Sequence, residues 1–193
     1  MTRARSTLPA DYFDALYASD PDPWKFATSP YEREKYALTP AALPRARYAS
    51  ALEVGCSIGV LSRDLAMRCD RLLAIDAAEA PLLEANRRCA DRPAVQFTKM
   101  FVPQQWPEGA FDLILLSEVI YYLSADDVTR LASCVTRSLC REGDVVLVHW
   151  TGETDYPLSG DEACDIFIGC MERMRIERRD RHSVFRIDVL VDD

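Results

Sequence analysis

The most informative absence in this 193-residue chain is a long apolar run, because none approaches the roughly 20 residues that a membrane-spanning helix needs. The N-terminal stretch MTRARSTLPADYF also lacks the apolar core of a secretory signal, so we expect no export and a cytoplasmic location. An excess of positive charge is missing as well, since 31 acidic residues outnumber 23 basic ones and the formal net charge is −8. Such a surface repels phosphate backbones and anionic lipid, which argues against nucleic-acid or membrane-surface binding.

Metal-binding patterns are also absent. The chain has two histidines, His149 and His182, and its seven cysteines form no C-x-x-C pair. We therefore predict no structural zinc site and no other metal site. An odd number of scattered cysteines in a chain that is not exported is typical of reduced thiols, mostly in the core.

Glycine is scarce, with seven in the chain, yet two of them lie close together in the stretch LEVGCSIG. Gly55 ends a short apolar run and Gly59 precedes a helix-like pattern. Without a Cβ, both residues can adopt a positive φ and let a ligand approach the backbone closely. Amides at the start of the following helix can then bind a carboxylate or phosphate. The alternative is a tight strand-to-helix turn that binds nothing.

From residue 51 onward, strand-like and helix-like segments alternate. The predicted strands are 51–55, 71–75, 94–98, 111–117 and 144–149, and the predicted helices are 59–68, 78–90, 125–140 and 159–170. The continuous apolar runs LILL and VVLV are typical of parallel strands covered on both faces. The end of the chain predicts two more strands joined near residues 181–183, the last of them antiparallel. The pattern indicates an α/β fold with a Rossmann-like, doubly wound, seven-stranded and mostly parallel sheet.

Residues 1–50 predict a helical cap segment before this core. The stretch LPADYFDALYASD has helical spacing, and the two prolines of DPDPW end that helix. In SPYEREKYALTPAAL, Ser29 is the predicted N-cap, Pro30 the first helical residue, and Glu32 the partner in a capping box. No repeat or low-complexity tract interrupts the chain, so we predict one domain over 1–193, with 51–193 as its core.

An acidic residue, Asp76, ends the second predicted strand, 21 residues beyond Gly55. A carboxylate at this position can accept hydrogen bonds from both hydroxyls of a ribose, whereas the alternative is a cap for the next helix. The glycine turn and the acid together indicate a nucleoside cofactor. The dinucleotide fingerprint G-x-G-x-x-G and the lysine of a P-loop are both absent.

The segment LEVGCSIG resembles the E-x-G-x-x-x-G motif of class I S-adenosylmethionine-dependent methyltransferases. The segments FDLILLSEVIYYL and LCREGDVVLVHW are similar to that family's fourth and fifth strands. The resemblance implies S-adenosyl-L-methionine as cofactor, with Glu53 before the turn, the turn at the methionine part and Asp76 at the ribose.

A narrower resemblance is carried by DPDPWKFATSPYEREKY, LEVGCSIGVLSRDL and SEVIYYL. These stretches are similar, in the same order, to the NodS family of nodulation N-methyltransferases, which methylate the free amine of a deacetylated chitooligosaccharide. The stretch HWTGETDYPLSGDEACDIF has no counterpart there. Another amino sugar, a small amine or a hydroxyl is therefore an equally open acceptor.

The predicted cofactor-binding residues come from this motif and the segments around it. They are Glu53, Gly55, Cys56, Gly59, Asp76, Ala77, Met100, Phe101, Ser117, Trp24, Tyr31 and Arg33. Backbone groups near Met100 and Phe101 are expected to contact the adenine, with ordinary core packing as the alternative. The helix that carries Tyr31 and Lys35 is expected to close over the cofactor. An exposed charged face is the alternative for Arg33 and the favoured interpretation for Lys35.

Methyl transfer requires an acceptor atom with a free lone pair, and the predicted catalytic residues are His149, Glu118 and Tyr122. His149 ends the fifth strand and suits proton uptake near neutral pH, although a hydrogen-bonded structural role is the alternative. Glu118 follows the fourth strand and would bind a cationic acceptor or take its proton; a cofactor contact or helix cap is the alternative. Trp24, Tyr31 and Trp150 would line the pocket or simply pack.

We therefore predict a methyltransferase that N-methylates a small polar acceptor such as an amino sugar or oligosaccharide. An O-methyltransferase acting on a small molecule is one alternative, and a non-catalytic cofactor-binding protein of the same fold is another. The sequence does not define the oligomeric state.

Overall fold

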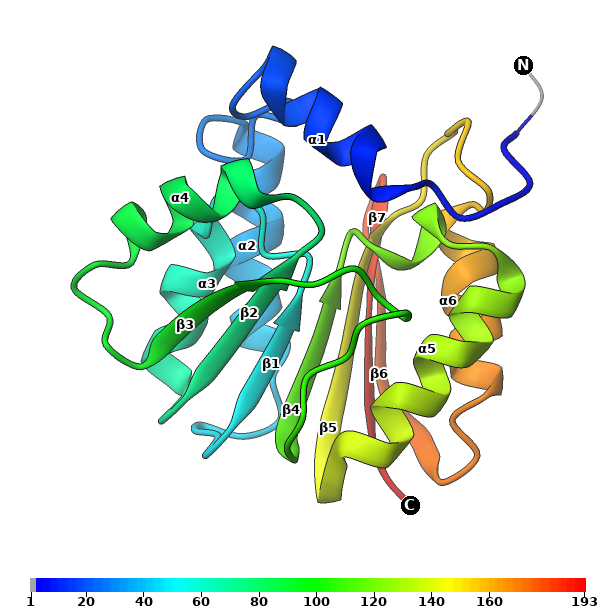
Figure 1. Cartoon of the computed structure of the whole chain (residues 1–193). Coiled ribbons are helices and arrows are strands. Elements are labelled where there is room, and N and C mark those ends of the chain that lie inside the picture. The colour runs from blue at the N-terminus through cyan, green and yellow to red at the C-terminus, as the bar shows by residue number, and fades with distance from the viewer. Residues whose placement is uncertain (1–2) are drawn as a thin grey trace. The chain divides into compact units, whose positions relative to one another are not determined.

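The computed structural model describes residues 3–193, and it divides into two compact units (Figure 1). The N-terminal unit is Pro9–Phe101. The C-terminal unit is Val102–Asp193 together with the described residues up to Leu8. The single domain predicted over residues 1–193, with 51–193 as its core, stays a prediction.

The N-terminal unit contains the cap helices and the first three strands. Its elements are α1 (Ala10–Ser19), α2 (Pro30–Ala42), β1 (Ala51–Val54), α3 (Val60–Leu65), the short 3-10 helix η1 (Ala66–Arg68), β2 (Leu72–Asp76), α4 (Glu79–Arg88) and β3 (Val95–Lys99). Strand β1 pairs in parallel with β2, and β2 with β3. All four residues of β1 are buried, as expected of a parallel strand covered on both faces.

The predicted end of α1 and the predicted start of α2 are confirmed. Helix α1 stops at Ser19, before the two prolines, and the Asp22 carboxylate then accepts hydrogen bonds from the backbone N–H groups of Phe26 and Ala27. Helix α2 starts at Pro30 with Ser29 as N-cap, whose hydroxyl accepts from the backbone N–H of Glu32. Proline at the first helical position loses nothing there, because that N–H has no partner within the helix.

The C-terminal unit contains the remaining four strands. Its elements are β4 (Phe111–Ser117), the 3-10 helix η2 (Ile120–Tyr122), α5 (Ala125–Ser138), β5 (Leu139–Trp150), α6 (Gly160–Gly169), β6 (Met174–Arg181) and β7 (Phe185–Asp192). Helices α5 and α6 lie side by side, next to the strands of this unit (Figure 1). Helix α6 begins with the Ser159–Glu162 capping box, in which each side chain accepts from the other's backbone N–H.

The strands form a seven-stranded sheet in the order β3-β2-β1-β4-β5-β7-β6. Strand β7 runs antiparallel to both β5 and β6, which confirms the predicted antiparallel last strand. The side chain of Arg186 on β7 is fully buried and forms two hydrogen bonds with the Asp188 carboxylate. The predicted α/β fold class is therefore confirmed.

The start of β5 differs from the prediction, which extended the preceding helix to residue 140 and began the strand at 144. Helix α5 ends at Ser138, and β5 begins immediately at Leu139. Leu139 pairs with Phe111, and the register shifts before the regular ladder resumes at Leu113 and Asp144. Glu142, with a φ of 60°, lies in this irregular stretch. Local propensity alone therefore does not predict that the strand begins before residue 144.

Among the described residues, no helix is both long enough and apolar enough to cross a membrane.

Candidate functional site

The turn after β1 has a left-handed backbone at three of five residues. Gly55 has a φ of 88°, Ser57 of 47° and Gly59 of 75°. Ser57 is the exception among them, because a residue with a Cβ is strained in this region by roughly 1–2 kcal/mol relative to glycine. At Gly59 a Cβ would lie 2.9 Å from the Cα of Ala85, so close packing against α4 requires glycine there as well. The turn is therefore a tightly constrained backbone loop.

Asp76, at the end of β2, lies directly against this turn. One carboxylate oxygen accepts from the backbone N–H of Ser57 at 2.9 Å, and the other from that of Ala78 at 3.0 Å. Burial raises the pKa of Asp76, and the backbone N–H groups partly offset that rise. Asp76 caps the turn before α4, and it is also partly exposed at the strand end. It can therefore serve both as a helix cap and as a ribose acceptor. The structure brings the predicted glycine turn and the predicted acid together.

Glu53, on β1, is 1% exposed. Neither of its carboxylate oxygens has a hydrogen-bond partner within residues 3–193. Burial raises the pKa of Glu53 to about 7, and the nearby Ser62 hydroxyl opposes that rise. A buried carboxyl without a partner is costly for a fold to keep, which makes it a candidate for binding a positively charged group.

The cap helix α1 reaches the turn through Tyr17. The Tyr17 hydroxyl is hydrogen-bonded to the Ser57 hydroxyl, and the ring packs with Ile58 and Ala78 in a small apolar cluster. Trp24 packs edge-on against Tyr17, with 5.7 Å between ring centroids. The sequence analysis did not single out Tyr17 as a site residue, because its spacing indicated only a helix face.

Helix α2 shows that the solvent-exposed position favoured for Lys35 is wrong, and it bears on the cofactor role predicted for Arg33. Lys35 is 1% exposed rather than solvated: its Nζ lies 2.9 Å from the Glu32 carboxylate and over the rings of Tyr31 and Tyr36. The predicted shared face of Tyr31 and Lys35 is therefore present. Arg33 lies on the opposite, exposed face of the helix, which favours the charged-face alternative over cofactor binding.

Of the other predicted cofactor-binding residues of this unit, one is buried in the core and three are partly exposed near strand ends. Cys56 is buried with Ala74 and Leu82, so it can offer only its backbone to a ligand. Burial raises the pKa of its thiol, which keeps it protonated. Met100 and Phe101 are partly exposed beyond β3, and the N–H of Met100 already donates to the carbonyl of Asp76. Ala77 is partly buried beside Asp76.

In the C-terminal unit, Glu118 follows β4 with a φ of 55°, another left-handed residue with a side chain. One of its carboxylate oxygens, Oε2, accepts from the Tyr121 hydroxyl at 2.7 Å and from the backbone N–H of Trp150 at 2.9 Å. Ser117, the residue before it, is buried at the end of the strand. The carboxylate of Glu118 is thus held in one orientation by two donors.

His149 has no exposed surface. Its Nε2 lies 3.3 Å from the backbone N–H groups of both Val119 and Ile120 and accepts from them. A nitrogen that accepts backbone hydrogen bonds cannot also take a proton from a substrate without losing them. The geometry therefore favours the structural interpretation of His149 over the general base.

Three tyrosines form a cluster beside Glu118. Tyr156 stacks on Tyr121 with 5.4 Å between ring centroids, and it meets Tyr122 edge-on at 4.5 Å. Burial raises the pKa of both Tyr121 and Tyr122 well above the usual value, so neither ionises near neutral pH. Tyr122 is consequently unsuited to act as a base. Tyr156 was missed by the sequence analysis, and its loop carries no motif that would have indicated it.

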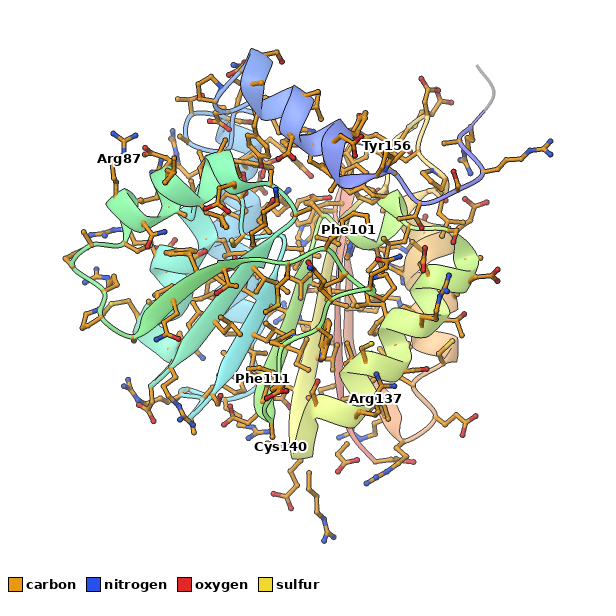
Figure 2. The ribbon with its side chains drawn as sticks, in the orientation of Figure 1. Arg87, Phe101, Phe111, Arg137, Cys140 and Tyr156 are labelled. Carbon is orange, nitrogen blue, oxygen red and sulfur yellow. The ribbon has the colours of Figure 1, made fainter. Side chains whose placement is uncertain are left out.

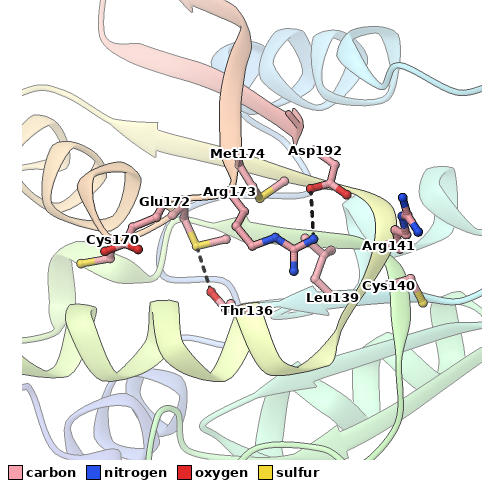
Figure 3. Close-up of a pocket in the computed structure, with 10 residues that line it drawn as sticks. Thr136, Leu139, Cys140, Arg141, Cys170, Glu172, Arg173, Met174 and Asp192 are labelled. Carbon is pink, nitrogen blue, oxygen red and sulfur yellow. Dashed lines mark hydrogen bonds and ion pairs between the residues drawn. The ribbon is translucent and has the colours of Figure 1, made fainter.

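A separate pocket of about 360 Å³ lies in the C-terminal unit, lined among others by Leu139, Met174 and Asp192 (Figure 3). Arg173 forms an ion pair with Asp192 across it at 3.8 Å. None of the predicted site residues lines this pocket. Figure 2 shows Tyr156 at one end of this unit's strands and Cys140, which lines the pocket, at the other. No group of three or more metal-ligating side chains occurs within residues 3–193.

The groups of the N-terminal unit fit a nucleoside with a cationic tail. Asp76 offers a fixed carboxylate to a diol, and charge-assisted hydrogen bonds of this kind contribute roughly 1.5–3 kcal/mol each. Glu53 offers an unpaired buried carboxylate to an ammonium group. The C-terminal unit adds an oriented carboxylate, Glu118, among aromatic side chains.

Residues 14–147 match the family model described as Nodulation protein S (NodS). Nodulation protein S of Rhizobium tropici is 36% identical over 58% of this chain and 47% of its own length. The homologue from Bradyrhizobium diazoefficiens is 33% identical over 59% of this chain and 54% of its own length. The chain thus spans about half the length of the curated relatives it matches.

Two solved structures are similar over more of the chain. A putative methyltransferase from Pseudomonas syringae is 38% identical with a TM-score of 0.74, covering 83% of this chain and 98% of that one. The N-methyltransferase NodS from Bradyrhizobium japonicum WM9, in complex with S-adenosyl-L-homocysteine, is 21% identical with a TM-score of 0.79, covering 95% and 97%. The second likeness shows the shared fold. With the family model matching well over half of its residues, the chain belongs to the NodS family.

Proposed function

We propose that this chain is an S-adenosyl-L-methionine-dependent methyltransferase that methylates the amine of a small polar acceptor, such as an amino sugar or oligosaccharide. The observation that carries the proposal is Asp76, whose carboxylate is fixed against a left-handed turn by the N–H groups of Ser57 and Ala78. Membership of the NodS family supports it, since a NodS structure was solved with S-adenosyl-L-homocysteine.

In this proposal the N-terminal unit binds the cofactor, which supplies a methyl group on a sulfonium. Asp76 accepts hydrogen bonds from the ribose hydroxyls, and the ionised form of the Glu53 carboxyl attracts the ammonium of the methionine part. Tyr17 holds the Ser57 hydroxyl and so keeps the turn in its strained conformation. Each of these groups binds or orients, and none reacts.

Glu118 is the proposed acceptor-binding residue of the C-terminal unit. An amine arrives at neutral pH as an ammonium ion, which a carboxylate attracts. Transfer of one proton from the ammonium to Glu118 leaves the nitrogen lone pair free to attack the methyl carbon. Because Oε2 already accepts two hydrogen bonds, the carboxylate is oriented before the acceptor arrives.

His149 has a positioning role in this mechanism. By accepting from the N–H groups of Val119 and Ile120, its ring fixes the backbone between Glu118 and the tyrosines. Both His149 and Glu118 were predicted as possible proton acceptors, and in this proposal Glu118 alone has that role.

The function is tested with purified chain and S-adenosyl-L-methionine carrying a labelled methyl group. The acceptors are glucosamine, a deacetylated chitooligosaccharide, and their N-acetylated counterparts. We expect label on the free amines and none on the acetylated sugars. Label on hydroxyls of both sets would instead indicate an O-methyltransferase, and cofactor binding without transfer to any acceptor would indicate a non-catalytic protein.

Replacing Glu118 by glutamine tests its role directly. Glu118→Gln keeps an oxygen for the Tyr121 and Trp150 donors but removes the charge and the proton acceptor. We expect kcat to fall about 100-fold, within the usual range for a general base, with unchanged affinity for S-adenosyl-L-homocysteine. Glu108→Gln, at an exposed position of the same unit, is the control and should retain full activity. Wild-type turnover in Glu118→Gln would eliminate the assignment.

A further inference from the structure

Tyr156 lies in the segment between β5 and α6, outside the residues 14–147 that match the family model. It is partly buried at the end of the C-terminal unit opposite Cys140 (Figure 2). Its side chain comes from a loop rather than a strand, so its position depends on what holds that loop.

The loop is fixed on both sides of Tyr156. The backbone N–H of Leu158 donates to the carbonyl of Tyr121 at 3.3 Å, and that of Ala4 donates to the carbonyl of Asp155 at the same distance. Just beyond it, α6 begins at Gly160, which lies against the Trp150 carbonyl. Tyr156 is therefore presented to its neighbours by a hydrogen-bonded segment.

The contact that matters most is the one with Tyr121. The two rings are nearly parallel, at 10°, with centroids 5.4 Å apart. Tyr121 also contacts Tyr122, edge-on at 4.6 Å, and His149, whose ring is perpendicular to it at 5.6 Å. The Tyr121 ring thus contacts both Tyr156 and His149, and its hydroxyl donates to Oε2 of Glu118 at 2.7 Å.

We propose that Tyr156 is a positioning residue for Glu118, acting through the ring of Tyr121. Stacking fixes the Tyr121 ring, the ring directs its hydroxyl, and the hydroxyl orients the carboxylate that receives the acceptor amine. The inference rests on the proposed function. It implies that the segment 151–159 contributes to the choice of a cationic amine as acceptor.

The kinetic test compares Tyr156→Ala with Tyr156→Phe, using the amine that the wild-type chain methylates fastest. Tyr156→Phe retains the ring and should keep KM within twofold of wild type. Tyr156→Ala removes the ring and should raise the KM for the amine about tenfold. The free energy of an aromatic pair, converted at about 1.4 kcal/mol for each factor of ten, corresponds to a change of that order. The affinity for S-adenosyl-L-homocysteine should be unchanged in both variants. A residue that only stabilised the fold would lower the melting temperature without moving KM selectively.

A second measurement does not depend on turnover. In chain labelled with ¹³C at glutamate carboxyls, the Glu118 resonance is assigned by its loss in Glu118→Gln. Tyr121→Phe removes the hydroxyl donor and should shift that resonance. Tyr156→Ala should shift it in the same direction, whereas Tyr156→Phe should leave it in place.

The outcomes separate the two proposals. A Glu118 resonance that Tyr121→Phe moves but Tyr156→Ala does not would overturn the role of Tyr156, whatever the acceptor. A wild-type chain that binds no S-adenosyl-L-homocysteine, or that methylates no amine, would overturn the proposed function in the wild-type assay itself. The resonance shifts would still decide the relay from Tyr156 to Glu118.

Discussion

Ser57 and Glu118 are two residues with side chains at backbone conformations that glycine adopts at least cost. Each comes shortly after a strand, and each side chain is held by a tyrosine: Ser57 by Tyr17, and Glu118 by Tyr121. The strain of roughly 1–2 kcal/mol per residue is offset by those hydrogen bonds. Strained residues of this kind gather at functional sites, which agrees with the roles proposed for both turns.

The buried carboxyl of Glu53 should make stability depend on pH. Its pKa is raised from an ordinary value of 4.5 to about 7 by burial, so the folded state holds the proton more tightly than the unfolded state. This contribution is fully present below pH 4.5 and is lost as the pH rises through 7. Glu53→Gln removes the titration. We expect its free energy of unfolding, relative to wild type, to increase by on the order of 3 kcal/mol between pH 4 and pH 8.

Urea unfolding at several pH values measures this difference. Glu34→Gln, at an exposed position of the same unit, is the matched control for the substitution itself. A difference that stays flat with pH for Glu53→Gln would mean that its carboxyl does not titrate between the two pH values.

The residues that sequence reasoning missed share a physical cause. Tyr17 and Tyr156 owe their roles to neighbours far along the chain, Ser57 and Tyr121. Helical spacing showed that Tyr31 and Lys35 share a face, but a lysine on a charged helix is usually solvated. Burial of Lys35 depends on what covers α2, and the local pattern does not carry that information.

At the scale of elements, α6 contains two glycines in contrasting surroundings. A Cβ on Gly160, its first residue, would lie 1.8 Å from the carbonyl oxygen of Trp150, whereas one on Gly169, its last, would meet nothing within 4 Å. Gly160→Ala should therefore destabilise the fold by about 3 kcal/mol or more. Gly169→Ala should change stability by less than about 1 kcal/mol, because the open site accommodates the methyl group. Chemical denaturation of both variants checks the contrast, and equal effects would contradict it.

Element types were predictable where local chemistry decides them. The Ser29 cap and Pro30 predicted the start of α2, the proline pair predicted the end of α1, and the apolar runs predicted β4 and the regular part of β5. The first residues of β5 were not predictable. Leu139 is part of the strand because it pairs with Phe111, and that pairing exists only in the folded sheet.

For the whole molecule, the alternation of strands and helices was enough to predict the sheet, including its antiparallel last strand. The residues proposed to bind the cofactor were also predictable, because Gly55 and Gly59 belong to a recognisable motif and Asp76 ends the next predicted strand. The residues proposed to act on the acceptor were predictable only in part. Glu118 directly follows a predicted strand, whereas Tyr156 comes from a loop that is hydrogen-bonded to Ala4 and Tyr121.

Ligand binding should stabilise the whole chain if the cofactor assignment is right. A ligand that binds only the folded state adds about 2.7 kcal/mol to the free energy of unfolding when present at 100 times its Kd. We expect S-adenosyl-L-homocysteine to produce this increase and NAD to produce none, measured by urea unfolding with and without each ligand. Because no acceptor takes part in this measurement, the result does not depend on knowing which acceptor the chain methylates.

Asp76→Asn assigns that stabilisation to the proposed ribose contact. The amide can still accept from one backbone N–H of the turn, but it loses the charge that strengthens hydrogen bonds to the diol. Affinity should fall roughly 10- to 100-fold, so the same ligand concentration would add no more than about 1.4 kcal/mol. Asp64→Asn, at an exposed position on α3, is the control and should keep the full increase. Full stabilisation of Asp76→Asn by S-adenosyl-L-homocysteine would mean that the ribose binds elsewhere. Full stabilisation of the wild-type chain by NAD would mean that the chain binds a nicotinamide dinucleotide and that the proposed cofactor is wrong.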